Sequence, residues 1–303
     1  MKILVTGGNG FIGSHLCESL INSGYDVKSL DLKFHSNSKY YNCEKIVADI
    51  VTSDILKNVI KNTDLVIHLA AVSRVDDAQR NPIKCYNSNV LGVLKILEAL
   101  KKTKAKLIFG SSREVYGESK KLPVREDYDK NPITIYGSSK LAGEELLKIY
   151  KKIYGLDYII LRFANVFGSP RDIPQRVIPR FINLALQQEP LTINGGKQVI
   201  DFTFIDDVVE GIMKIVKRIS TNEKDLFGND YNLASGKGTS INDLSKIIKK
   251  IFNSNSKLIF NIERKYDVQN FIGDYSKAKS TFSYEPKHSL EEGLKIYKKR
   301  LQL

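Results

Sequence analysis

A stretch of glycines near the start of the chain constrains the fold more than any other feature. Residues 3–13 read ILVTGGNGFIG, so an apolar run typical of a buried strand leads into Gly7, Gly10 and Gly13. Glycines at this spacing allow a tight turn, close approach of the backbone to a pyrophosphate, and packing of the next helix on the strand. Free N–H groups at the helix N-terminus attract an anion. The stretch predicts a nucleotide site, with plain turn glycines as the alternative.

An acidic residue after the second predicted strand indicates which nucleotide would bind. A helix is expected from Phe11 to Ser23, followed by a strand over 26–30 that ends on Asp31. An acid roughly 20 residues beyond such glycines can accept a hydrogen bond from a ribose 2′-hydroxyl. A carboxylate repels a 2′-phosphate, so NAD is preferred over NADP, although Lys33 close by weakens this preference. An ordinary loop acid is the other interpretation of Asp31.

The first half of the chain alternates short apolar runs with longer helical stretches. Strands are predicted at 2–6, 26–30, 45–48, 64–69, 106–110 and 157–163. This alternation is typical of the α/β class, here a Rossmann-type doubly wound parallel sheet with helices on both faces. Ligands of such sheets bind at the carboxyl ends of the strands, so Asp49, Ile50, Ala70 and Ala71 are expected beside the cofactor. Helix–strand packing is the other interpretation of the two alanines.

The pattern changes after residue 165, which predicts an NAD-binding domain over 1–165 and a smaller α/β substrate-binding lobe over 166–303. In the second part, loops are expected at 168–176 and 187–197, helices at 176–188, 206–219, 240–252 and 289–301, and short strands at 231–233 and 257–262. The segment 206–219 is expected to return to the first domain, so the C-terminal lobe is predicted to be discontinuous.

Composition and charge exclude several other classes of function. The 303 residues carry a formal net charge of +13, but the lysines are spread over helix faces that are usually solvated, so no nucleic-acid partner is predicted. Cys17, Cys43 and Cys85 lack ligand-like spacing, which predicts neither a disulfide framework nor a metal site. No apolar run approaches the roughly 20 residues of a membrane span and no signal peptide precedes the first strand, so a cytoplasmic protein is expected.

Candidate catalytic residues follow the fifth predicted strand. Tyr136 and Lys140 are four residues apart, so a helix places them on one face, one turn apart. A tyrosine with an ordinary pKa of about 10 is a poor base at neutral pH. A nearby lysine ammonium and a cationic nicotinamide would together lower that pKa, and Ser112 can add a hydrogen bond to the reacting hydroxyl. Tyr-x-x-x-Lys alone arises by chance, and its coincidence with the glycine turn makes it informative.

Together these motifs resemble the extended short-chain dehydrogenase/reductase family, specifically its NAD-dependent nucleotide-sugar epimerases and dehydratases, such as the UDP-glucose 4-epimerases. The resemblance covers essentially the whole chain and extends to 68–71, Asn89, 111–112, 115–117, 162–168, 201–208, 274–278 and 289–293. It implies an enzyme that transfers hydride from the sugar C4 to NAD while the tyrosine takes the hydroxyl proton. In the epimerases, the resulting 4-keto sugar receives the hydride on its other face.

The resemblance also implies roles for individual residues. Around NAD it places Gly7, Gly10, Phe11, Ile12, Gly13, Asp31, Asp49, Ile50, Leu69, Ala70, Ala71, Asn89, Tyr136 and Lys140. Around the substrate it places Ser112, Asn165 and Arg264, because the planar guanidinium of an arginine suits a diphosphate. A surface arginine is the other interpretation of Arg264. The resemblance further implies a homodimer formed through two helices of the first domain.

Two departures from the family pattern leave the substrate open. Ile200 stands where the family usually has an arginine before Asp-Phe-Thr, and Arg176, Arg180 or Lys197 could replace that arginine. We assign Arg176 to the substrate site. The second departure is Arg113-Glu114, where dehydratases normally carry Asp-Glu. Decarboxylases of UDP-glucuronate also carry the glutamate, whereas 4-epimerases usually have a small or hydroxyl residue there.

Because arginine does not donate a proton at useful pH, the elimination step of a dehydratase lacks its acid. We therefore predict a UDP-glucose/UDP-galactose-like nucleotide-sugar 4-epimerase, with Tyr136, Lys140, Ser112 and Glu114 as catalytic residues. Pairing with Arg113 is the alternative to a direct role for Glu114. A dehydratase, decarboxylase or reductase on the same scaffold is the close alternative function, and a non-catalytic NAD-sensing protein is the remote one.

Overall fold

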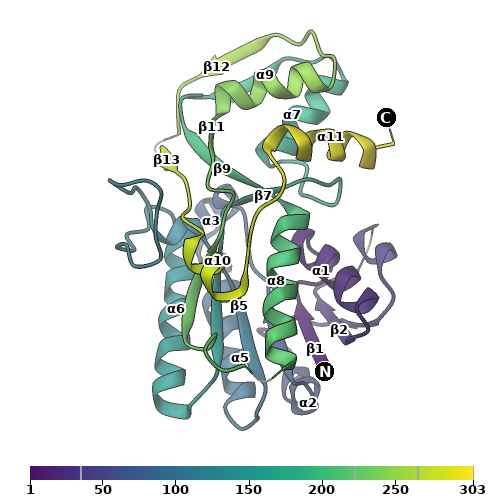
Figure 1. Cartoon of the computed structure of the whole chain (residues 1–303), viewed down its shortest axis with the longest axis vertical. Helices are drawn as coiled ribbons and strands as arrows, with labels where there is room; N and C mark the ends of the chain where they lie inside the picture. The colour runs from purple at the N-terminus through teal and green to yellow at the C-terminus, as the bar shows by residue number, and fades with distance from the viewer. Residues whose placement is uncertain (35, 222, 265, 303) are drawn as a thin grey trace.

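A seven-stranded parallel sheet forms the centre of the larger part of the molecule in the computed structural model (Figure 1). The structure describes residues 1–34, 36–221, 223–264 and 266–302. The sheet contains β1 (Lys2–Thr6), β2 (Asp26–Asp31), β3 (Glu44–Val47), β4 (Leu65–His68), β5 (Lys106–Ser112), β6 (Tyr158–Phe163) and β10 (Asn229–Leu233). Their spatial order is β10-β6-β5-β4-β1-β2-β3, so the strand order reverses between β1 and β4. The predicted doubly wound class is confirmed, and this reversal is where such sheets bind ligands.

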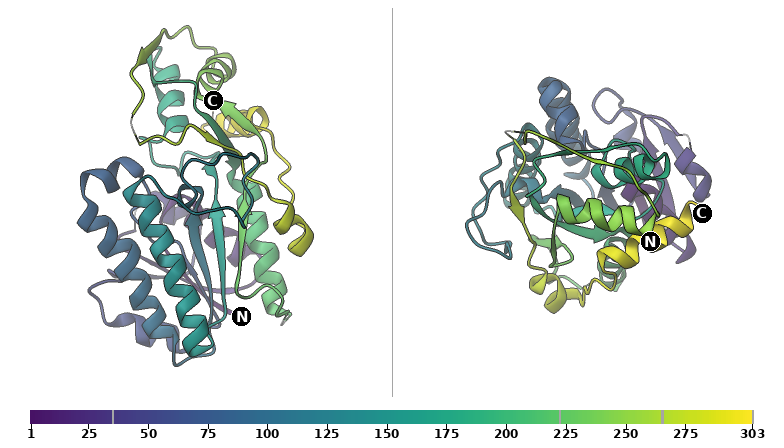
Figure 2. Two further views of the ribbon diagram at one scale, coloured as in Figure 1. Left: turned by 90° about the vertical axis from the view of Figure 1, so that its left-hand side faces the viewer. Right: turned by 90° about the horizontal axis from the view of Figure 1, so that it is seen from above.

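The central strands are apolar along most of their length because helices cover both faces of the sheet. Ile3 and Val5 of β1 contact one hydrophobic core and Leu4 contacts the other, as the alternation along a strand requires. The first face carries α1 (Phe11–Asn22) and α8 (Ile205–Ser220), and the second carries α2 (Ile55–Lys61), α5 (Gly92–Leu100) and α6 (Ile135–Tyr154). Figure 2 shows α5 and α6, in blue and teal, side by side on the second face.

Local sequence signals set the ends of α6, the helix that carries the predicted tyrosine and lysine. The hydroxyl of Thr134 accepts a hydrogen bond from the Gly137 N–H, and Gly155 ends the helix with a φ of +70°. Thr134 is therefore a typical N-cap residue, and Gly155 is a typical C-cap glycine. The shorter helices of this part of the chain are η1 (Ser36–Tyr40), α3 (Val75–Arg80), α4 (Pro82–Tyr86), η2 (Asn87–Leu91) and η3 (Arg113–Val115).

A smaller α/β lobe sits at the carboxyl ends of the sheet strands, in the upper part of Figure 1. It contains β7 (Asn165–Phe167), α7 (Val177–Leu186), β8 (Leu191–Asn194), β9 (Val199–Phe204), β11 (Gly238–Ser240), α9 (Ile241–Ile251), β12 (Leu258–Asn261), β13 (Asn270–Phe271) and α11 (Leu290–Arg300). Strand β9 pairs with β7, β11 and β13, while β8 and β12 pair with each other. This lobe therefore closes over the sheet edge where a ligand is expected.

Two segments of the C-terminal half return to the large sheet. Helix α8 packs against α1, and β10 pairs with β6 in parallel. Helix α10 (Ser276–Phe282) contacts both α8 and β10. These contacts support the proposal of two parts, 1–165 and 166–303, with residues 206–219 returning to the first, and they extend the returning portion to β10.

Most predicted elements occur within a few residues of their expected bounds, but two expectations were wrong. Residues 191–194 lie in the expected loop 187–197 and instead form β8, which pairs with β12. The run 231–233 was expected in the smaller lobe, whereas it belongs to the large sheet. Both errors concern strand pairing between distant segments, which a local pattern does not contain.

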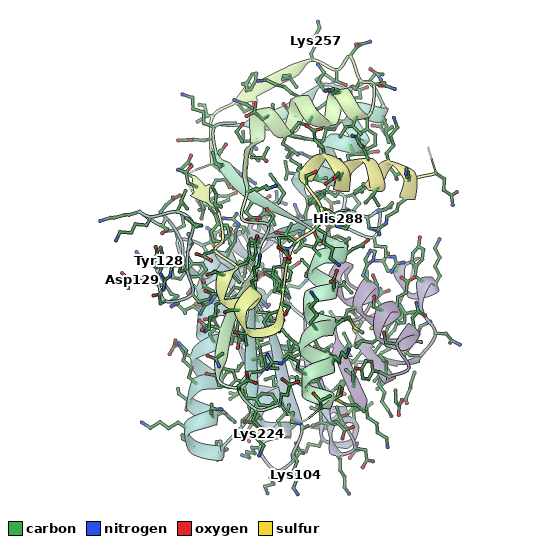
Figure 3. The ribbon with its side chains drawn as sticks, viewed as in Figure 1. Lys104, Tyr128, Asp129, Lys224, Lys257 and His288 are labelled. Carbon is green, nitrogen blue, oxygen red and sulfur yellow. The ribbon has the colours of Figure 1, made fainter. Side chains whose placement is uncertain are left out.

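Lysine side chains lie at both ends of the molecule. The labelled lysines in Figure 3 lie at opposite ends of the molecule, with Lys257 at the tip of the smaller lobe and Lys104 and Lys224 at the far end of the sheet. Among the described residues, no helix combines the length and apolar character needed to cross a membrane. In the same residues, no group of three or more His, Cys, Asp or Glu side chains is placed to hold a metal ion.

Candidate active site

A cavity of about 1280 Å³ lies between the carboxyl edge of the sheet and the smaller lobe. Its lining brings together nearly all predicted site residues from both halves of the chain, namely Gly7, Gly10, Phe11, Ile12, Gly13, Asp31, Asp49, Ile50, Leu69, Ala70, Ala71, Ser112, Glu114, Tyr136, Lys140, Asn165, Arg176 and Arg264. Asn89 is the predicted residue that does not line it. The chain therefore gathers its predicted cofactor and substrate residues in a single space.

The glycine turn is packed so tightly that side chains would not fit. Gly7 has a φ of +73°, and a Cβ added there would lie 2.7 Å from the Ala70 backbone nitrogen. A Cβ on Gly13 would lie 2.1 Å from the Gly7 carbonyl oxygen. Both distances are far below van der Waals contact with backbone that cannot rotate away. The bare backbone leaves the start of α1 open towards the cavity, as binding of a pyrophosphate requires.

Asp31 is held at the end of β2 beside this turn. One carboxylate oxygen accepts a hydrogen bond from the Asn9 N–H at 2.9 Å, and the other accepts one from the Leu32 N–H at 2.8 Å. The side chain lines the cavity. Its position matches that expected for a carboxylate facing a ribose.

Asn89 is buried behind the cavity wall, where it supports the segment after β4. Its amide oxygen accepts a hydrogen bond from the Val72 N–H at 2.8 Å, and its amide nitrogen donates to the Val72 carbonyl and to the Ser139 hydroxyl. The side chain therefore ties the backbone after Ala71 to α6. This geometry supports a positioning role, because the cofactor contact implied by the resemblance would require the side chain to reach the cavity.

Tyr136 and Lys140 lie on the same face of α6, as the four-residue spacing predicts. The Lys140 Nζ donates a hydrogen bond to the Gly110 carbonyl at 2.7 Å and lies 6.0 Å from the centre of the Tyr136 ring. Burial raises the pKa of Tyr136 to about 12, although the Arg176 charge and a hydrogen bond with Ser112 oppose this rise. Burial lowers the pKa of Lys140 to about 8. The protein groups alone therefore do not produce the low tyrosine pKa expected from the sequence.

Arg113 and Glu114 form an ion pair at the cavity wall. The Arg113 Nη2 lies 2.8 Å from a Glu114 carboxylate oxygen, and both side chains are about nine-tenths buried. The Arg113 Nε also donates a hydrogen bond to the Asn165 side-chain oxygen at 2.6 Å. The pairing weighed as the alternative for Glu114 is therefore present, and it links Glu114 through Arg113 to Asn165.

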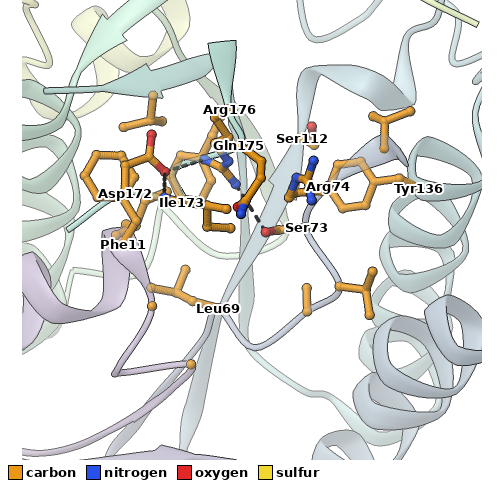
Figure 4. A pocket seen from close by; sticks show the side chains of 18 of the residues that line it. Phe11, Leu69, Ser73, Arg74, Ser112, Tyr136, Asp172, Ile173, Gln175 and Arg176 are labelled. Atoms are coloured by element: carbon orange, nitrogen blue, oxygen red, sulfur yellow. Dashed lines mark hydrogen bonds and ion pairs between the residues drawn. The ribbon is translucent and has the colours of Figure 1, made fainter. Parts of the chain in front are cut away.

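The predicted substrate arginines come from the smaller lobe and reach across the cavity. Figure 4 shows Arg176 opposite Tyr136, with contacts to Asp172 and Ser73. Arg264 donates to both carboxylate oxygens of Asp76 on α3, at 2.7 and 3.0 Å, and to Asp267 at 3.0 Å. Arg264 thus bridges the two lobes. Lys197, another residue considered in place of an arginine at Ile200, does not line the cavity.

Several cavity residues were not identified from the sequence. Asp172 is buried, and burial raises the pKa of its carboxyl group to about 6 despite the nearby Arg176. Asp76 lies on α3 and holds Arg264, while Ser73 contacts Arg176. No local motif marks these residues, because their importance depends on which distant arginine each one meets.

Comparisons with known proteins agree with this geometry. The model of a family described as "NAD dependent epimerase/dehydratase family" matches residues 3–234. A putative UDP-glucose 4-epimerase of Methanocaldococcus jannaschii is 38% identical over 97% of this chain and 96% of its own length. UDP-glucuronic acid decarboxylase 1 of Danio rerio is 32% identical over 97% of this chain and 71% of its own.

Solved structures are also similar along the whole chain. The crystal structure of a UDP-glucuronic acid 4-epimerase from Bacillus cereus, in complex with UDP-glucuronic acid and NAD, has a TM-score of 0.92 and 32% sequence identity. The alignment covers 100% of this chain and 99% of that one. The similarity therefore includes both lobes and the cavity between them.

Proposed function

Because the chain belongs to the NAD-dependent epimerase/dehydratase family, we propose that it is a UDP-sugar 4-epimerase acting on UDP-glucose, UDP-galactose or a closely related sugar. The observation that carries this proposal is the arrangement at the end of β5. Ser112, Tyr136 and Lys140 share the cavity with the glycine turn, while Arg113 engages Glu114. This set suits oxidation and re-reduction of an alcohol, and it provides no acid beside Glu114 for expelling a hydroxyl.

The residues on the cofactor side fit NAD. The glycine turn is a closely packed backbone segment in which a Cβ at Gly7 or Gly13 would clash, and Asp31 lies beside it at the end of β2. When bound, NAD supplies the acceptor and donor of the hydride at the sugar C4, and its nicotinamide ring carries a positive charge. This charge matters because Tyr136, with a pKa of about 12 in the protein alone, requires a nearby positive charge to become an effective base.

The protein residues then have distinct tasks. Tyr136 takes the proton of the C4 hydroxyl and returns it after the 4-keto sugar has turned over, while Ser112 hydrogen-bonds the same oxygen. Lys140, held by the Gly110 carbonyl, keeps its ammonium group near the tyrosine ring. On the substrate side, Asn165, Arg176 and Arg264 face the nucleotide diphosphate. Burial excludes water from the reacting groups, since Tyr136 is 8% exposed.

A decarboxylase is the second candidate, and a specific observation favours it. Glu114 lines the cavity, and the Danio rerio relative is a UDP-glucuronic acid decarboxylase. A decarboxylase needs the same oxidation at C4 but no acid to expel a hydroxyl. Arg113 in place of an acid therefore argues against a dehydratase but not against a decarboxylase. The products of the two reactions differ in mass.

The function is tested by incubating the NAD-loaded protein with UDP-glucose, UDP-galactose, UDP-glucuronate and UDP-N-acetylglucosamine, and identifying products by mass spectrometry and NMR. We expect a product of unchanged mass that is inverted at C4. A product lighter by carbon dioxide establishes the decarboxylase, and one lighter by water overturns the epimerase in favour of a dehydratase. Full occupancy by NAD with no turnover of any sugar favours the NAD-sensing alternative.

The matched control for this assay is Tyr136→Phe, which removes only the phenolic hydroxyl. We expect turnover to fall by about a thousandfold, in line with the loss of a general base, whereas NAD affinity falls by no more than about tenfold, as the loss of one hydrogen bond implies. Turnover close to that of the unaltered protein would show that another group takes the proton. Isothermal titration with NAD checks that the cofactor site remains intact.

Three further proposals concern the molecule as a whole. We propose a homodimer, supported by exposed apolar side chains on α4, η2 and α6, which are Ile83, Tyr86, Leu91, Ile149 and Ile153. We propose a cytoplasmic location, supported by the composition and by the nucleotide-sugar chemistry. We also retain the two parts, 1–165 and 166–303, with 206–219 and β10 returning to the first part; the separate sheets of the two lobes support this division.

A further inference from the structure

Six arginines line the cavity, and their partners differ. Five of them lie within ion-pair distance of a carboxylate in the described part of the chain: Arg74 with Asp76 and Asp77, Arg113 with Glu114, Arg171 with Glu18, Arg176 with Asp172, and Arg264 with Asp76 and Asp267. For Arg180, no ion pair is found among the described residues. The charge of Arg180 is therefore the one within this group that has no carboxylate bound to it.

The groups around Arg180 are polar, but none of those described forms an ion pair with its guanidinium. It lies on α7, and its Nη2 donates a hydrogen bond to the Thr192 carbonyl on β8 at 3.1 Å. Its Nε is buried and has no hydrogen-bond partner in the structure. Burial lowers the pKa of Arg180, and the like charges of Arg264 and Arg74 lower it further, while Asp76 opposes them. A guanidinium in this setting is costly for the folded chain unless an anion also binds there.

The position of Arg180 relative to the other cations identifies the kind of anion. Arg180 on α7 and Arg264 in the segment that follows β12 both line the cavity. Arg264 already shares its charge with two carboxylates. Within this pair, the guanidinium that has no carboxylate bound to it is therefore that of Arg180, whose planar fork can bind two oxygens at once. A phosphate group beside Arg264 could bind to Arg180, because no carboxylate among the described residues is bound to Arg180.

We propose that Arg180 is a substrate-binding residue that contacts the diphosphate of the nucleotide sugar together with Arg264. This inference rests on the proposed function, since a diphosphate is the charged part of a UDP-sugar. It also adds Arg180 to Arg176 as a replacement for the arginine that is missing at Ile200: Ile200 lines the same cavity with an apolar side chain, and Lys197 does not line it. The charge for the diphosphate comes from α7 rather than from β9.

A purely structural role is the competing explanation, because the Arg180 guanidinium also ties α7 to β8. Arg180→Gln distinguishes the two roles, since glutamine keeps an N–H donor for the Thr192 carbonyl but has no charge. Arg180→Lys keeps the charge but loses the fork. Lys197→Gln is the matched control, because it removes a positive charge from the same lobe outside the cavity. Thermal unfolding of each variant checks that α7 and β8 remain packed.

The experiment measures binding of UDP and of inorganic pyrophosphate to the NAD-loaded protein by isothermal titration. We expect Arg180→Gln to weaken both ligands by about tenfold to a hundredfold, as the loss of a charged hydrogen bond implies, and Arg180→Lys to weaken them less. Lys197→Gln should bind both within about twofold of the unaltered protein. NAD affinity should be unchanged in all three variants.

The outcomes separate this proposal from the proposed function. The inference is overturned if Arg180→Gln binds both ligands as the unaltered protein does, if it loses NAD affinity instead, or if neither ligand binds the unaltered protein. Pyrophosphate binding that depends on Arg180, without binding of UDP, would support the contact between Arg180 and a diphosphate. It would contradict the proposal that the substrate is a uridine nucleotide.

Discussion

Asp172 illustrates how a single buried residue ties the stability of this protein to pH. Its side chain lies in the loop before α7, where it accepts a hydrogen bond from the Ile173 N–H at 2.7 Å and lies 3.5 Å from Arg176. Burial raises the pKa of its carboxyl group from 3.8 to about 6. The neutral form is therefore favoured in the folded state, and the ionised form carries a desolvation cost at neutral pH.

We expect the free energy of unfolding of Asp172→Asn to increase relative to that of the unaltered protein as the pH rises from 4 to 7. Between pH 4 and 6 the folded state holds a proton on Asp172 that the unfolded state has released, so the contribution of Asp172 to stability falls as pH increases. The difference amounts to roughly 3 kcal/mol at most. Urea unfolding of both proteins at pH 4, 5, 6 and 7 measures it. A difference that stays constant over this range would contradict the assignment.

Among the elements, the packing of the glycine turn against α1 depends most directly on residues that have no Cβ. The Cβ of an alanine at position 13 would lie 2.1 Å from the Gly7 carbonyl oxygen and 2.9 Å from the Gly8 Cα. Because these are backbone atoms, the turn or the helix has to move. The same backbone is proposed to face the pyrophosphate of NAD, so stability and cofactor affinity should change together.

We expect Gly13→Ala to lower NAD affinity at least tenfold and to cost about 1–3 kcal/mol of stability, as overpacking usually does. Gly155→Ala at the end of α6 is the control: an added Cβ meets nothing within 4 Å, but the φ of +70° disfavours a side chain. It should cost about 1 kcal/mol and leave NAD affinity unchanged. Titration with NAD and urea unfolding measure both effects. Equal NAD affinities for the two variants would contradict the proposal that the closely packed glycine turn binds NAD.

Helix α6 carries the proposed catalytic groups on its inward face. Tyr136, Lys140 and Glu144 follow one another at four-residue intervals, so they occupy one face. Glu144 is fully buried and pairs with Arg162 of β6 at 2.7 Å, and the Ser111 hydroxyl donates to the same carboxylate. This network fastens α6 to the end of β5, next to Ser112. The distance between Ser112 and Tyr136 therefore depends on a buried ion pair behind the cavity.

At the scale of the whole molecule, the outer face of α6 presents apolar side chains to solvent. Ile149 is 49% exposed and Ile153 is 62% exposed, and they lie one turn apart. Ile83 on the neighbouring α4 is 76% exposed. Exposed apolar side chains on helices that pack together are typical of an interface between proteins. The homodimer implied by the sequence resemblance would cover them.

We expect the protein to be a dimer in solution and the double variant Ile149→Glu/Ile153→Glu to be a monomer, because four charges would have to be buried at a two-fold interface. Ile262→Glu is the control, since Ile262 is 92% exposed and lies in the smaller lobe after β12. Light scattering coupled to size exclusion measures the mass of each. A monomeric unaltered protein, or a dimeric double variant, would rule out this face as the interface.

The elements built from consecutive residues were predictable from the sequence. The strand, glycine turn and helix at residues 2–22, the end of β2 at Asp31, and the spacing of Tyr136 and Lys140 all depend on neighbours in the chain. The strands β8, β9 and β13 were not predicted, because each is defined by pairing with a distant segment. The hydrogen bonds of Asn89 were also not predictable, since its partners Val72 and Ser139 are 17 and 50 residues away in the sequence.

What the sequence by itself determined is the fold class, the glycine turn at the end of β1 and the shared face of Tyr136 and Lys140, because backbone conformation and helix spacing are set by local residues. What only the tertiary structure decided is the electrostatics of the substrate half. Arg264 meets Asp76 across a separation of 188 residues, Arg113 meets Asn165 across 52, and Arg180 meets no carboxylate in the described chain. Since a charge is neutralised by whatever group lies near it in space, only the folded arrangement reveals which arginine of the cavity is left without a carboxylate among the described residues.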